Sequence, residues 1–226
     1  MFKANGKSLN GLTAVISGSG NVALYALQKA NQLGVKVVAM CDSNGYVYDA
    51  NGIDFATIRQ IKEVERLRIK VYAERVATAE YHEGCSGIWG VKCDVAFPCA
   101  TQNEIDAESA KKLIANGCQA VCEGANMPST PEAIAEIEKA GLLFSPAKAS
   151  NAGGVATSGL EMSQNSIRMG WSFDEVDEKL KGIMKNIFAS VDEAAKKVGK
   201  PGNYAAGANV AGFLKVAEAM LWQGVC

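Results

Sequence analysis

Short apolar runs alternate with longer amphipathic stretches along the first part of the chain. The first run, 13–17, ends at a Gly-Ser-Gly turn, and a helical pattern follows over 21–33. Gly34 is placed to end this helix, and a second apolar run of strand length follows at 35–41. We therefore expect a strand, a tight turn, a helix and a second strand, which together form one βαβ unit.

The same alternation continues to about residue 144. Asn-Gly pairs at 44–45 and 51–52 flank a short Tyr-Val-Tyr run, which predicts a small hairpin. Asp54 is placed to cap a helix that we expect to extend to about residue 79. Further apolar runs lie at 94–97, 120–122 and 142–144, separated by helical segments at about 104–116 and 131–140. This order predicts an α/β fold with a doubly wound, mostly parallel sheet and helices on both of its faces.

From Gly159 onward the pattern is helical only. Apolar residues recur there at three- and four-residue spacing in two stripes: Val176, Leu180, Ile183, Ile187, Val191 and Ala194, then Val210, Phe213, Leu214, Ala217 and Leu221. We expect both stripes to pack in the core against the sheet. Because there is no repeat, low-complexity stretch or proline-rich linker, we predict a single domain over 1–226, with a core at 1–158 and a helical C-terminal extension at 159–226.

Composition narrows the classes of ligand. The 23 basic and 24 acidic residues nearly balance, which argues against a nucleic-acid or anionic-membrane surface and favours a small ligand. Seven cysteines without a C-x-x-C pair indicate reduced, buried thiols in a cytoplasmic protein. The single histidine, His82, lies in a polar stretch, so we expect it at the surface and expect no metal site. No apolar run approaches the length of about 18 residues that a membrane span needs, and the N-terminus has no signal-peptide core.

The turn after the first predicted strand carries the clearest chemical signal. Gly18-Ser19-Gly20-Asn21-Val22-Ala23 fits the pattern G-x-G-x-x-G/A, in which Gly18 permits the tight turn and Gly20 lets the backbone approach a pyrophosphate. Ala23 is small enough for the helix to pack closely on the strand. The acidic residue Asp42 follows the next strand, as it does in dinucleotide-binding βαβ units.

The other predicted strands also end in polar or glycine-rich loops. These loops are 18–20, 42–43, 98–103, 123–126 and 145–154. In an open α/β sheet, ligands bind beyond the carboxyl ends of the strands, so we expect the loops to line one crevice. Such a crevice suits an extended dinucleotide, which needs hydrogen-bonding groups along its whole length.

Four segments resemble the C-terminal half of hexameric-type glutamate dehydrogenases. They are 16–23 (ISGSGNVA), 98–103 (PCATQN), 123–128 (EGANMP) and 151–162 (NAGGVATSGLEM), and the resemblance continues through 207–213 (GANVAGF). It runs nearly end to end. The resemblance implies a Rossmann-like cofactor domain of an oxidoreductase that interconverts glutamate with 2-oxoglutarate and ammonia.

The resemblance also implies roles for individual residues. The cofactor pyrophosphate is expected at Gly18, Ser19, Gly20, Asn21 and Val22, the adenosine ribose at Asp42 and Ser43, the middle of the cofactor at Ala100, Thr101 and Gln102, and the nicotinamide at Asn126 and Asn151. Val155 and Ser158 are expected to reach the substrate side chain.

The resemblance implies no catalytic residue in this chain. In the family, the working lysine and aspartate belong to an N-terminal domain for which this chain has no sequence, and we interpret Lys148 as structural. We therefore expect cofactor binding without turnover. The whole enzyme is expected to be a homo-hexamer that takes glutamate or 2-oxoglutarate, and this chain a monomer or weak dimer with some apolar helix surface left exposed.

Two arguments conflict on the choice of cofactor. Asp42 favours NAD, because an acidic residue there commonly binds the ribose 2′-hydroxyl and repels a 2′-phosphate. The stretch 42–45 nevertheless resembles NADP-dependent members, and Lys62 and Arg68 fall where those members place basic groups. Glu63 and Glu65 keep open the alternative that both cations belong to a solvated helix face. We favour NADP, with NAD as the alternative.

Other functions remain open on the sequence alone. A leucine, valine or phenylalanine dehydrogenase would share the fold, although the polar pair Thr157-Ser158 favours glutamate. A methyltransferase would also place glycines after its first strand, but it would leave the loops at Asn126 and Asn151 without a role. A non-catalytic nucleotide-binding module is the alternative from a different class.

Overall fold

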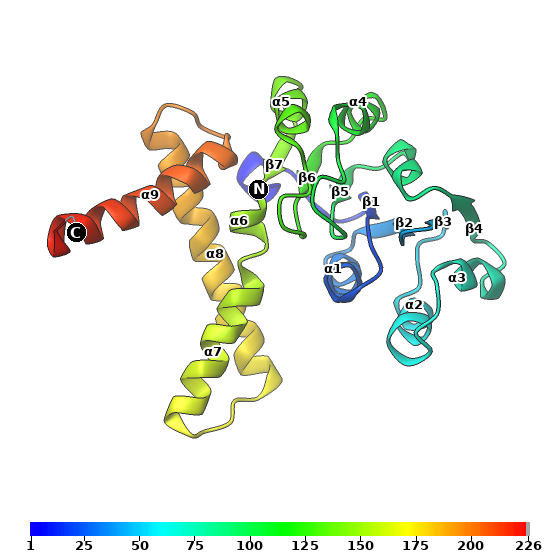
Figure 1. The fold of residues 1–226 in the computed structure, drawn as a ribbon, viewed down its shortest axis with the longest axis horizontal. Coiled ribbons are helices and arrows are strands. Elements are labelled where there is room, and N and C mark those ends of the chain that lie inside the picture. The colour runs from blue at the N-terminus through cyan, green and yellow to red at the C-terminus, as the bar shows by residue number, and fades with distance from the viewer. Residues whose placement is uncertain (225–226) are drawn as a thin grey trace. The chain divides into compact units, whose positions relative to one another are not determined.

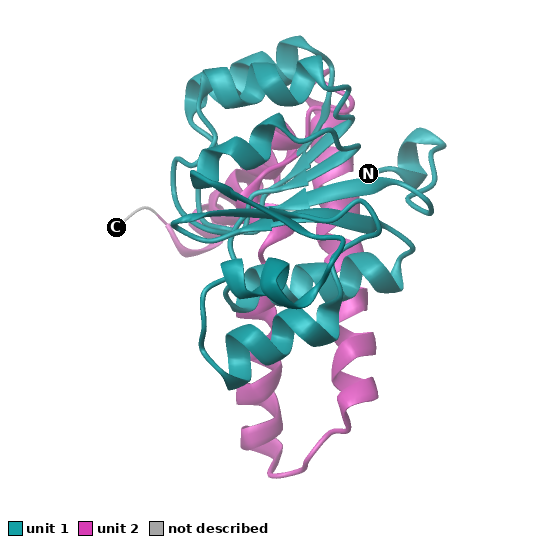
Figure 2. Cartoon of the chain, turned by 90° about the vertical axis from the view of Figure 1, so that its right-hand side faces the viewer, with its two compact units in different colours: residues 1–144 teal, residues 145–226 magenta. Residues whose placement is uncertain are grey.

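The computed structural model describes residues 1–224, which form two compact units (Figure 2). Unit 1 is Met1–Phe144 and unit 2 is Ser145–Cys226. Unit 1 holds a sheet with its covering helices, and unit 2 is almost entirely helical.

A seven-stranded sheet has the order β4-β3-β2-β1-β5-β6-β7. Its strands are β1 (Thr13–Ile16), β2 (Lys36–Cys41), β3 (Gly45–Tyr48), β4 (Glu80–Glu83), β5 (Val95–Phe97), β6 (Ala120–Cys122) and β7 (Leu143–Ser145). β1 pairs in parallel with β2 and β5, and β5 pairs in parallel with β6, whereas β2, β3 and β4 are antiparallel neighbours. The chain winds outward from β1 in both directions, which confirms the predicted doubly wound, mostly parallel sheet.

Helices cover both faces of the sheet (Figures 1 and 2). On one face lie α1 (Asn21–Gln32), α2 (Phe55–Arg59) and α3 (Lys70–Arg75), and on the other lie α4 (Ala107–Ala115) and α5 (Pro131–Lys139). Short helical turns are η1 (Lys3–Asn5), η2 (Gln60–Val64) and η3 (Cys85–Gly90). Asp54 caps α2 as predicted, because its carboxylate accepts a 2.7 Å hydrogen bond from the Thr57 amide. Ala23 and Leu27 of α1 are fully buried against the sheet, which is the close packing that the small residue permits.

The predicted helix from Asp54 to about residue 79 is wrong in its length. α2 ends at Arg59, the π-helical turn η2 follows, and Arg66 adopts a left-handed conformation with φ of 57° before α3 begins. Long-range and local hydrogen bonds replace the helical ones in this break. The Ile69 amide donates to Asp42 Oδ2 at 3.0 Å, and Lys62 Nζ donates to the Leu67 carbonyl at 2.8 Å.

Unit 2 contains α6 (Ala147–Ser150), α7 (Gly153–Ile167), α8 (Phe173–Lys197) and α9 (Tyr204–Gln223). α8 opens with a capping box in which Ser172 and Glu175 exchange side-chain and backbone hydrogen bonds. α8 and α9 pack closely, since a Cβ atom on Gly207 would collide with the Val191 carbonyl oxygen.

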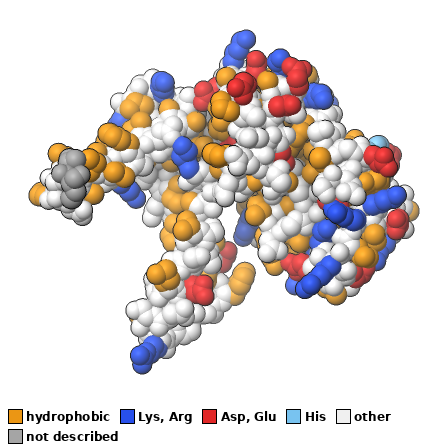
Figure 3. Space-filling model, in the orientation of Figure 1, with side chains coloured by type: hydrophobic (Ala, Val, Ile, Leu, Met, Phe, Trp, Pro, Cys, Tyr) orange, Lys and Arg blue, Asp and Glu red, His pale blue; other side chains and the backbone are white. Residues whose placement is uncertain are grey.

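The expected core packing of the two stripes is wrong for α9 and only partly met for α8. Val191 and Ala194 of α8 are buried, and the rest of that stripe is half-buried. On α9, Phe213 is 68% exposed and Leu221 is 86% exposed. The helix contact is made by small residues such as Gly207, so the larger apolar side chains point outward, and hydrophobic side chains lie along α9 in Figure 3.

The described cysteines are all free, as predicted, but Cys122 is only half-buried and Cys85 is exposed, because it lies on the surface turn η3. Cys226 lies outside the described residues. His82 is exposed, as predicted, and its ring stacks on Tyr46 with centroids 4.8 Å apart. Within residues 1–224, no helix has the length and apolar character to cross a membrane.

Candidate dinucleotide site

A cavity of about 700 Å³, which we call the crevice, opens in unit 1 at the carboxyl ends of β1, β2 and β5. Its volume falls in the range of about 300–1,000 Å³ that is typical of ligand sites. Ten of the predicted cofactor residues line it: Gly18, Ser19, Gly20, Asn21, Val22, Asp42, Ser43, Ala100, Thr101 and Gln102. The sheet therefore brings three predicted loops together, because parallel strands end at one edge.

The glycine turn after β1 forms the floor of the crevice. Gly18 has φ of +85°, and a Cβ atom there would lie 3.2 Å from Ala100 Cα and from the Cys99 carbonyl oxygen. Gly20 is the N-cap of α1, and a Cβ atom there would meet nothing within 4 Å. The first turn of α1 thus presents backbone amides, and the positive end of the helix dipole, to open space. This geometry fits an anionic pyrophosphate.

A hydrogen-bond network joins the end of β1 to the loop after β5. Ser17 Oγ accepts a 2.8 Å hydrogen bond from the Cys99 amide, and its hydroxyl donates to the Glu104 carboxylate. Glu104 Oε1 in turn accepts from the amides of Ala100 at 3.0 Å and Thr101 at 3.3 Å. Burial raises the pKa of Glu104, and these three hydrogen bonds oppose the shift. The network fixes the wall of the crevice opposite the glycine turn.

Asp42, at the end of β2, is already engaged by the protein. Its Oδ1 accepts from the Asn44 amide at 2.9 Å, and its Oδ2 accepts from the Ile69 amide at 3.0 Å. Arg68 Nη1 lies 3.9 Å from the same Oδ2 and donates to Ser43 Oγ at 2.9 Å. The carboxylate therefore stabilises the loops around it, and the neighbouring guanidinium offsets its charge.

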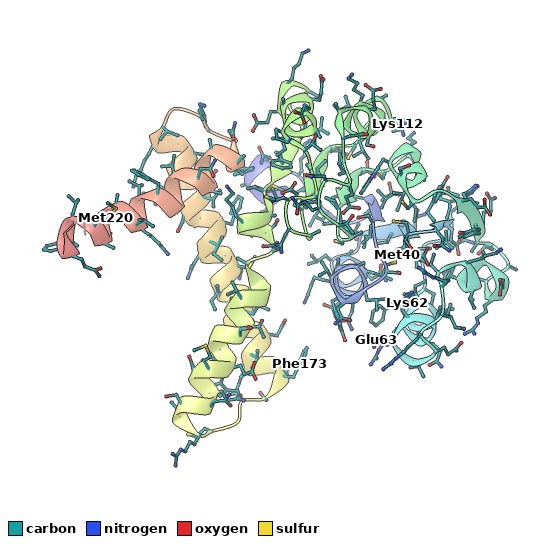
Figure 4. All side chains as sticks on the ribbon, viewed as in Figure 1. Met40, Lys62, Glu63, Lys112, Phe173 and Met220 are labelled. Carbon is teal, nitrogen blue, oxygen red and sulfur yellow. The ribbon has the colours of Figure 1, made fainter. Side chains whose placement is uncertain are left out.

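Lys62 lies beside this group, and we call Ser43, Lys62 and Arg68 the rim cluster. Burial lowers the pKa of Lys62, the Asp42 carboxylate opposes that shift, and the Arg68 charge adds to it, so the three charges lie within electrostatic reach. Neither Lys62 nor Arg68 lines the crevice itself. Lys62 appears in Figure 4, and Lys and Arg side chains gather over this part of unit 1 in Figure 3.

The two neighbouring glutamates are paired with other cations. Glu63 Oε2 lies 2.8 Å from Arg59 Nε, and Glu65 Oε2 lies 2.5 Å from Arg75 Nη2. Among the described ion pairs, neither glutamate is joined to Lys62 or Arg68. The rim cluster therefore keeps a net positive charge that an added anion could meet.

The loop that carries Asn126 is seated on the loop after β5. The amides of Gly124 and Ala125 both donate to the Pro98 carbonyl, at 2.9 and 3.0 Å. A Cβ atom on Gly124 would lie 2.6 Å from Cys99 Sγ, so a larger residue there would force the Cys99 side chain to move. Asn126 itself is exposed and does not line the crevice.

The remaining predicted site residues belong to unit 2. Asn151 ends α6 and is half-buried, whereas Val155 and Ser158 lie exposed near the start of α7. Their spacing of three places them on one side of the helix. Lys148 Nζ donates to Asn209 Oδ1 on α9, which agrees with a structural role for this lysine.

The sequence matches the family model of glutamate/leucine/phenylalanine/valine dehydrogenases over residues 1–224. The chain belongs to this family. It is 52% identical to a glutamate dehydrogenase of Bacteroides thetaiotaomicron, over 100% of this chain and 51% of that protein. It is 48% identical to an NADP-specific glutamate dehydrogenase of Escherichia coli, over 100% of this chain and 50% of that protein. The chain thus spans about half the length of the curated relatives that it matches.

Solved structures of glutamate dehydrogenases share the fold. The enzyme of Plasmodium falciparum matches with a TM-score of 0.95 and 49% identity, over 100% of this chain and 49% of that chain. A hetero-hexameric glutamate dehydrogenase of Thermus thermophilus matches with a TM-score of 0.84 and 27% identity, over 99% of this chain and 50% of that chain. The resemblance predicted from the sequence motifs is confirmed.

The crevice of this glutamate/leucine/phenylalanine/valine dehydrogenase family member also holds residues that the sequence analysis did not single out. They are Cys41, Cys85, Ser86, Ile88, Trp89 and Glu104, whereas Cys99 and Asn103 belong to the predicted loop 98–103. Trp89 and Glu104 are linked, since the indole Nε1 donates to the Glu104 carbonyl at 3.2 Å. The one available signal was the position of Glu104 directly after a predicted binding loop.

Proposed function

We propose that this chain is the cofactor-binding part of a glutamate dehydrogenase, with the dinucleotide seated in the crevice of unit 1. The observation that carries the proposal is the glycine turn at the start of α1. Gly18 packs closely against Ala100, whose amide donates to Glu104, and Gly20 has free space at its Cβ position. The family match and relatives named glutamate dehydrogenase support it. When bound, a nicotinamide cofactor supplies the hydride chemistry for reversible oxidative deamination of L-glutamate to 2-oxoglutarate and ammonia.

We infer that NADP(H) is preferred over NAD(H). Asp42 is the residue that would favour NAD, but both of its carboxylate oxygens accept hydrogen bonds from backbone amides, and it lies beside Arg68. Ser43, Lys62 and Arg68 together offer a hydroxyl and two cations to a 2′-phosphate. Several relatives are named NADP-specific, which agrees with this choice.

The nicotinamide and substrate assignments rest on the family resemblance. We propose Asn126 and Asn151 for the nicotinamide end, and Val155 and Ser158 for the substrate side chain. Thr157 and Ser158 place two hydroxyls on α7, and both donate to carbonyls one helical turn earlier. Hydroxyls at this position suit a carboxylate side chain better than the aliphatic or aromatic side chain of the other family substrates.

The chain alone is proposed to bind cofactor without turnover, because in the family that it resembles the lysine and aspartate that handle the amine and water protons belong to an N-terminal domain. Cofactor-dependent glutamate formation by the pure chain would refute this. In a whole enzyme of about twice the length, we propose a homo-hexamer, and for this chain a monomer or weak dimer. Six free cysteines among the described residues agree with the proposed cytoplasmic location.

Parallel fluorescence titrations with NADPH and NADH test the proposal. The chain should bind NADPH more tightly, and replacing Lys62 and Arg68 together by alanine should weaken NADPH binding by roughly ten- to a hundredfold while NADH binding changes little. A double alanine variant of Lys111 and Lys112 is the matched control, because it removes the same charge from exposed positions of α4 (Figure 4). Tighter binding of NADH would refute the NADP assignment, and binding of neither cofactor would refute the crevice as an autonomous site.

A further inference from the structure

Two carboxylates line a crevice that we propose for an anionic cofactor. They are Asp42 and Glu104, and none of the described residues that line the crevice is a lysine or arginine. Arg68 lies 3.9 Å from Asp42 and offsets its charge. Glu104 has no such cation in the described ion pairs and receives only hydrogen bonds, from Ser17 and from the amides of Ala100 and Thr101. A negative charge at Glu104 would therefore oppose a bound phosphate.

Glu104 lines the same crevice as the glycine turn. The Gly18 amide donates to Cys41 Sγ at 3.2 Å, so this thiol lies under the turn. Burial is the main cause that raises the pKa of Cys41 to about 12, although the hydrogen bond from the Gly18 amide opposes this shift, and the Glu104 charge adds to it. Burial, and after it the Glu104 charge, also raises the pKa of Cys99 to about 12. The carboxylate of Glu104 is therefore within electrostatic reach of the position proposed for the pyrophosphate.

We propose that Glu104 is a positioning residue of the crevice that takes up one proton when the phosphate-bearing cofactor binds. The inference rests on the proposed function. In the charged state, Oε1 holds the amides of Ala100 and Thr101 and so fixes the wall of the crevice. After a proton from solvent bonds to the other carboxylate oxygen, Oε1 remains an acceptor for both amides. The wall keeps its position while the charge disappears.

Among the titratable groups around the crevice, Glu104 is the one that we expect to take up the proton when the cofactor binds. Burial already raises its pKa, which favours the neutral form. The thiols of Cys41 and Cys99, which face it from β2 and from the loop after β5, are neutral because their pKa values are about 12. Asp42 is held by two backbone amides and by Arg68, and Cys85 also lines the crevice.

The test measures NADPH affinity against pH, between about pH 5 and about pH 8, for the full chain and three variants. Glu104→Gln keeps an acceptor oxygen without a charge, Glu104→Ala removes both, and Glu108→Gln is the control at an exposed position of α4. Wild-type affinity should fall as pH rises, by at most about tenfold per pH unit from this one group. Glu104→Gln should lose that part of the slope and bind more tightly than wild type at the higher pH. The 2′-phosphate of NADPH also titrates, with a pKa of about 6, but its contribution is the same for wild type and for Glu104→Gln.

Two further readouts complete the test. Calorimetry in buffers of different ionisation enthalpy should show proton uptake on binding by wild type and Glu108→Gln, and less by Glu104→Gln. Without cofactor, hydrogen exchange at the amides of Ala100 and Thr101 should be faster in Glu104→Ala than in the other proteins.

The outcomes separate this inference from the function on which it rests. If wild type binds NADPH but Glu104→Gln keeps the wild-type slope and proton uptake, the role of Glu104 is refuted and the function stands. If Glu104→Ala exchanges its loop amides at the wild-type rate, the positioning role is refuted. If wild type binds no cofactor at any pH, the proposed function fails, and the inference fails with it.

Discussion

Replacing Gly18 or Gly20 by alanine should separate folding from binding within one turn. Gly18 has φ of +85°, a conformation that costs alanine about 1–2 kcal/mol. The new Cβ atom would also lie 3.2 Å from Ala100 Cα and the Cys99 carbonyl oxygen, and this crowding adds about 1–3 kcal/mol. Gly20 has φ of −87° and ψ of −169°, which alanine adopts freely, and its Cβ atom would meet nothing within 4 Å.

The expected results follow from these numbers. Gly18→Ala should lose about 2–5 kcal/mol of unfolding free energy, which lowers the melting temperature by roughly 4–20 °C at about 2–4 °C per kcal/mol for a chain of this size. Gly20→Ala should lose only about 0.5–1 kcal/mol, from the poorer N-cap. It should nevertheless weaken NADPH binding by about tenfold or more, since the methyl group occupies the space proposed for the pyrophosphate.

Urea denaturation followed by circular dichroism, and fluorescence titration with NADPH, measure the two quantities. Gly182→Ala in α8 is the control, because its Cβ atom also meets nothing within 4 Å and its helix lies in unit 2. This variant should bind NADPH as wild type does and gain about 0.5–1 kcal/mol from helix propensity. The reasoning is refuted if Gly20→Ala binds NADPH with wild-type affinity, or if Gly18→Ala is as stable as Gly20→Ala.

Four further changes test the packing and the electrostatics. Gly207→Ala should cost about 1–3 kcal/mol, measured by thermal unfolding, because its Cβ atom would collide with backbone of α8; an unchanged melting temperature would contradict the close contact. Asp54→Ala should cost about 1 kcal/mol by loss of the α2 cap, and Asp54→Asn should recover most of it in the same assay. Cys85 should react with a thiol reagent before Cys41 and Cys99 and be protected by NADPH, as located by mass spectrometry, because Cys85 is exposed whereas burial raises the pKa of the other two thiols; equal labelling of Cys41 would refute this. The pKa of Glu104 is raised in the folded chain, so the unfolded chain loses this proton at lower pH, and stability falls as pH rises from about 4.3 through the folded pKa. The difference in urea midpoint between Glu104→Gln and wild type should therefore increase with pH in favour of the variant. A difference that stays constant with pH would refute this contribution of Glu104.

Local patterns in the sequence were sufficient to predict the strands at the centre of the sheet. β1, β2 and β5 are continuous apolar runs that end at turn residues, so their type and order followed from residues close together in the chain. β4 has the sequence Glu-Tyr-His-Glu and is mostly exposed, so no hydrophobic signal marks it. It becomes a strand because its backbone pairs with β3, which is a contact distant in sequence.

The same distinction between local and distant contacts determines which residues of the candidate site could be predicted from the sequence. The glycine turn and the loop at 100–102 were predictable, because their residue types are demanded by a turn and by a ligand. The ionic partners of Asp42 were only partly predictable, since Arg68 reaches it only after the helix breaks and the Ile69 amide turns toward the same carboxylate. Glu104 was not predictable, because its role depends on a loop that folds back onto its own side chain.

The exposed stripe on α9 shows what hydrophobic periodicity can and cannot determine. Val210, Phe213, Leu214, Ala217 and Leu221 repeat as a buried face would, and yet Phe213 and Leu221 are 68% and 86% exposed. Val155 on α7 is 74% exposed, and Phe173 at the start of α8 is 83% exposed. Monomeric proteins rarely leave so much apolar surface in contact with water. The curated relatives are about twice as long as this chain. A periodic stripe thus identifies an apolar face of a helix, but it does not determine whether that face is buried within the part of the chain that the structure describes.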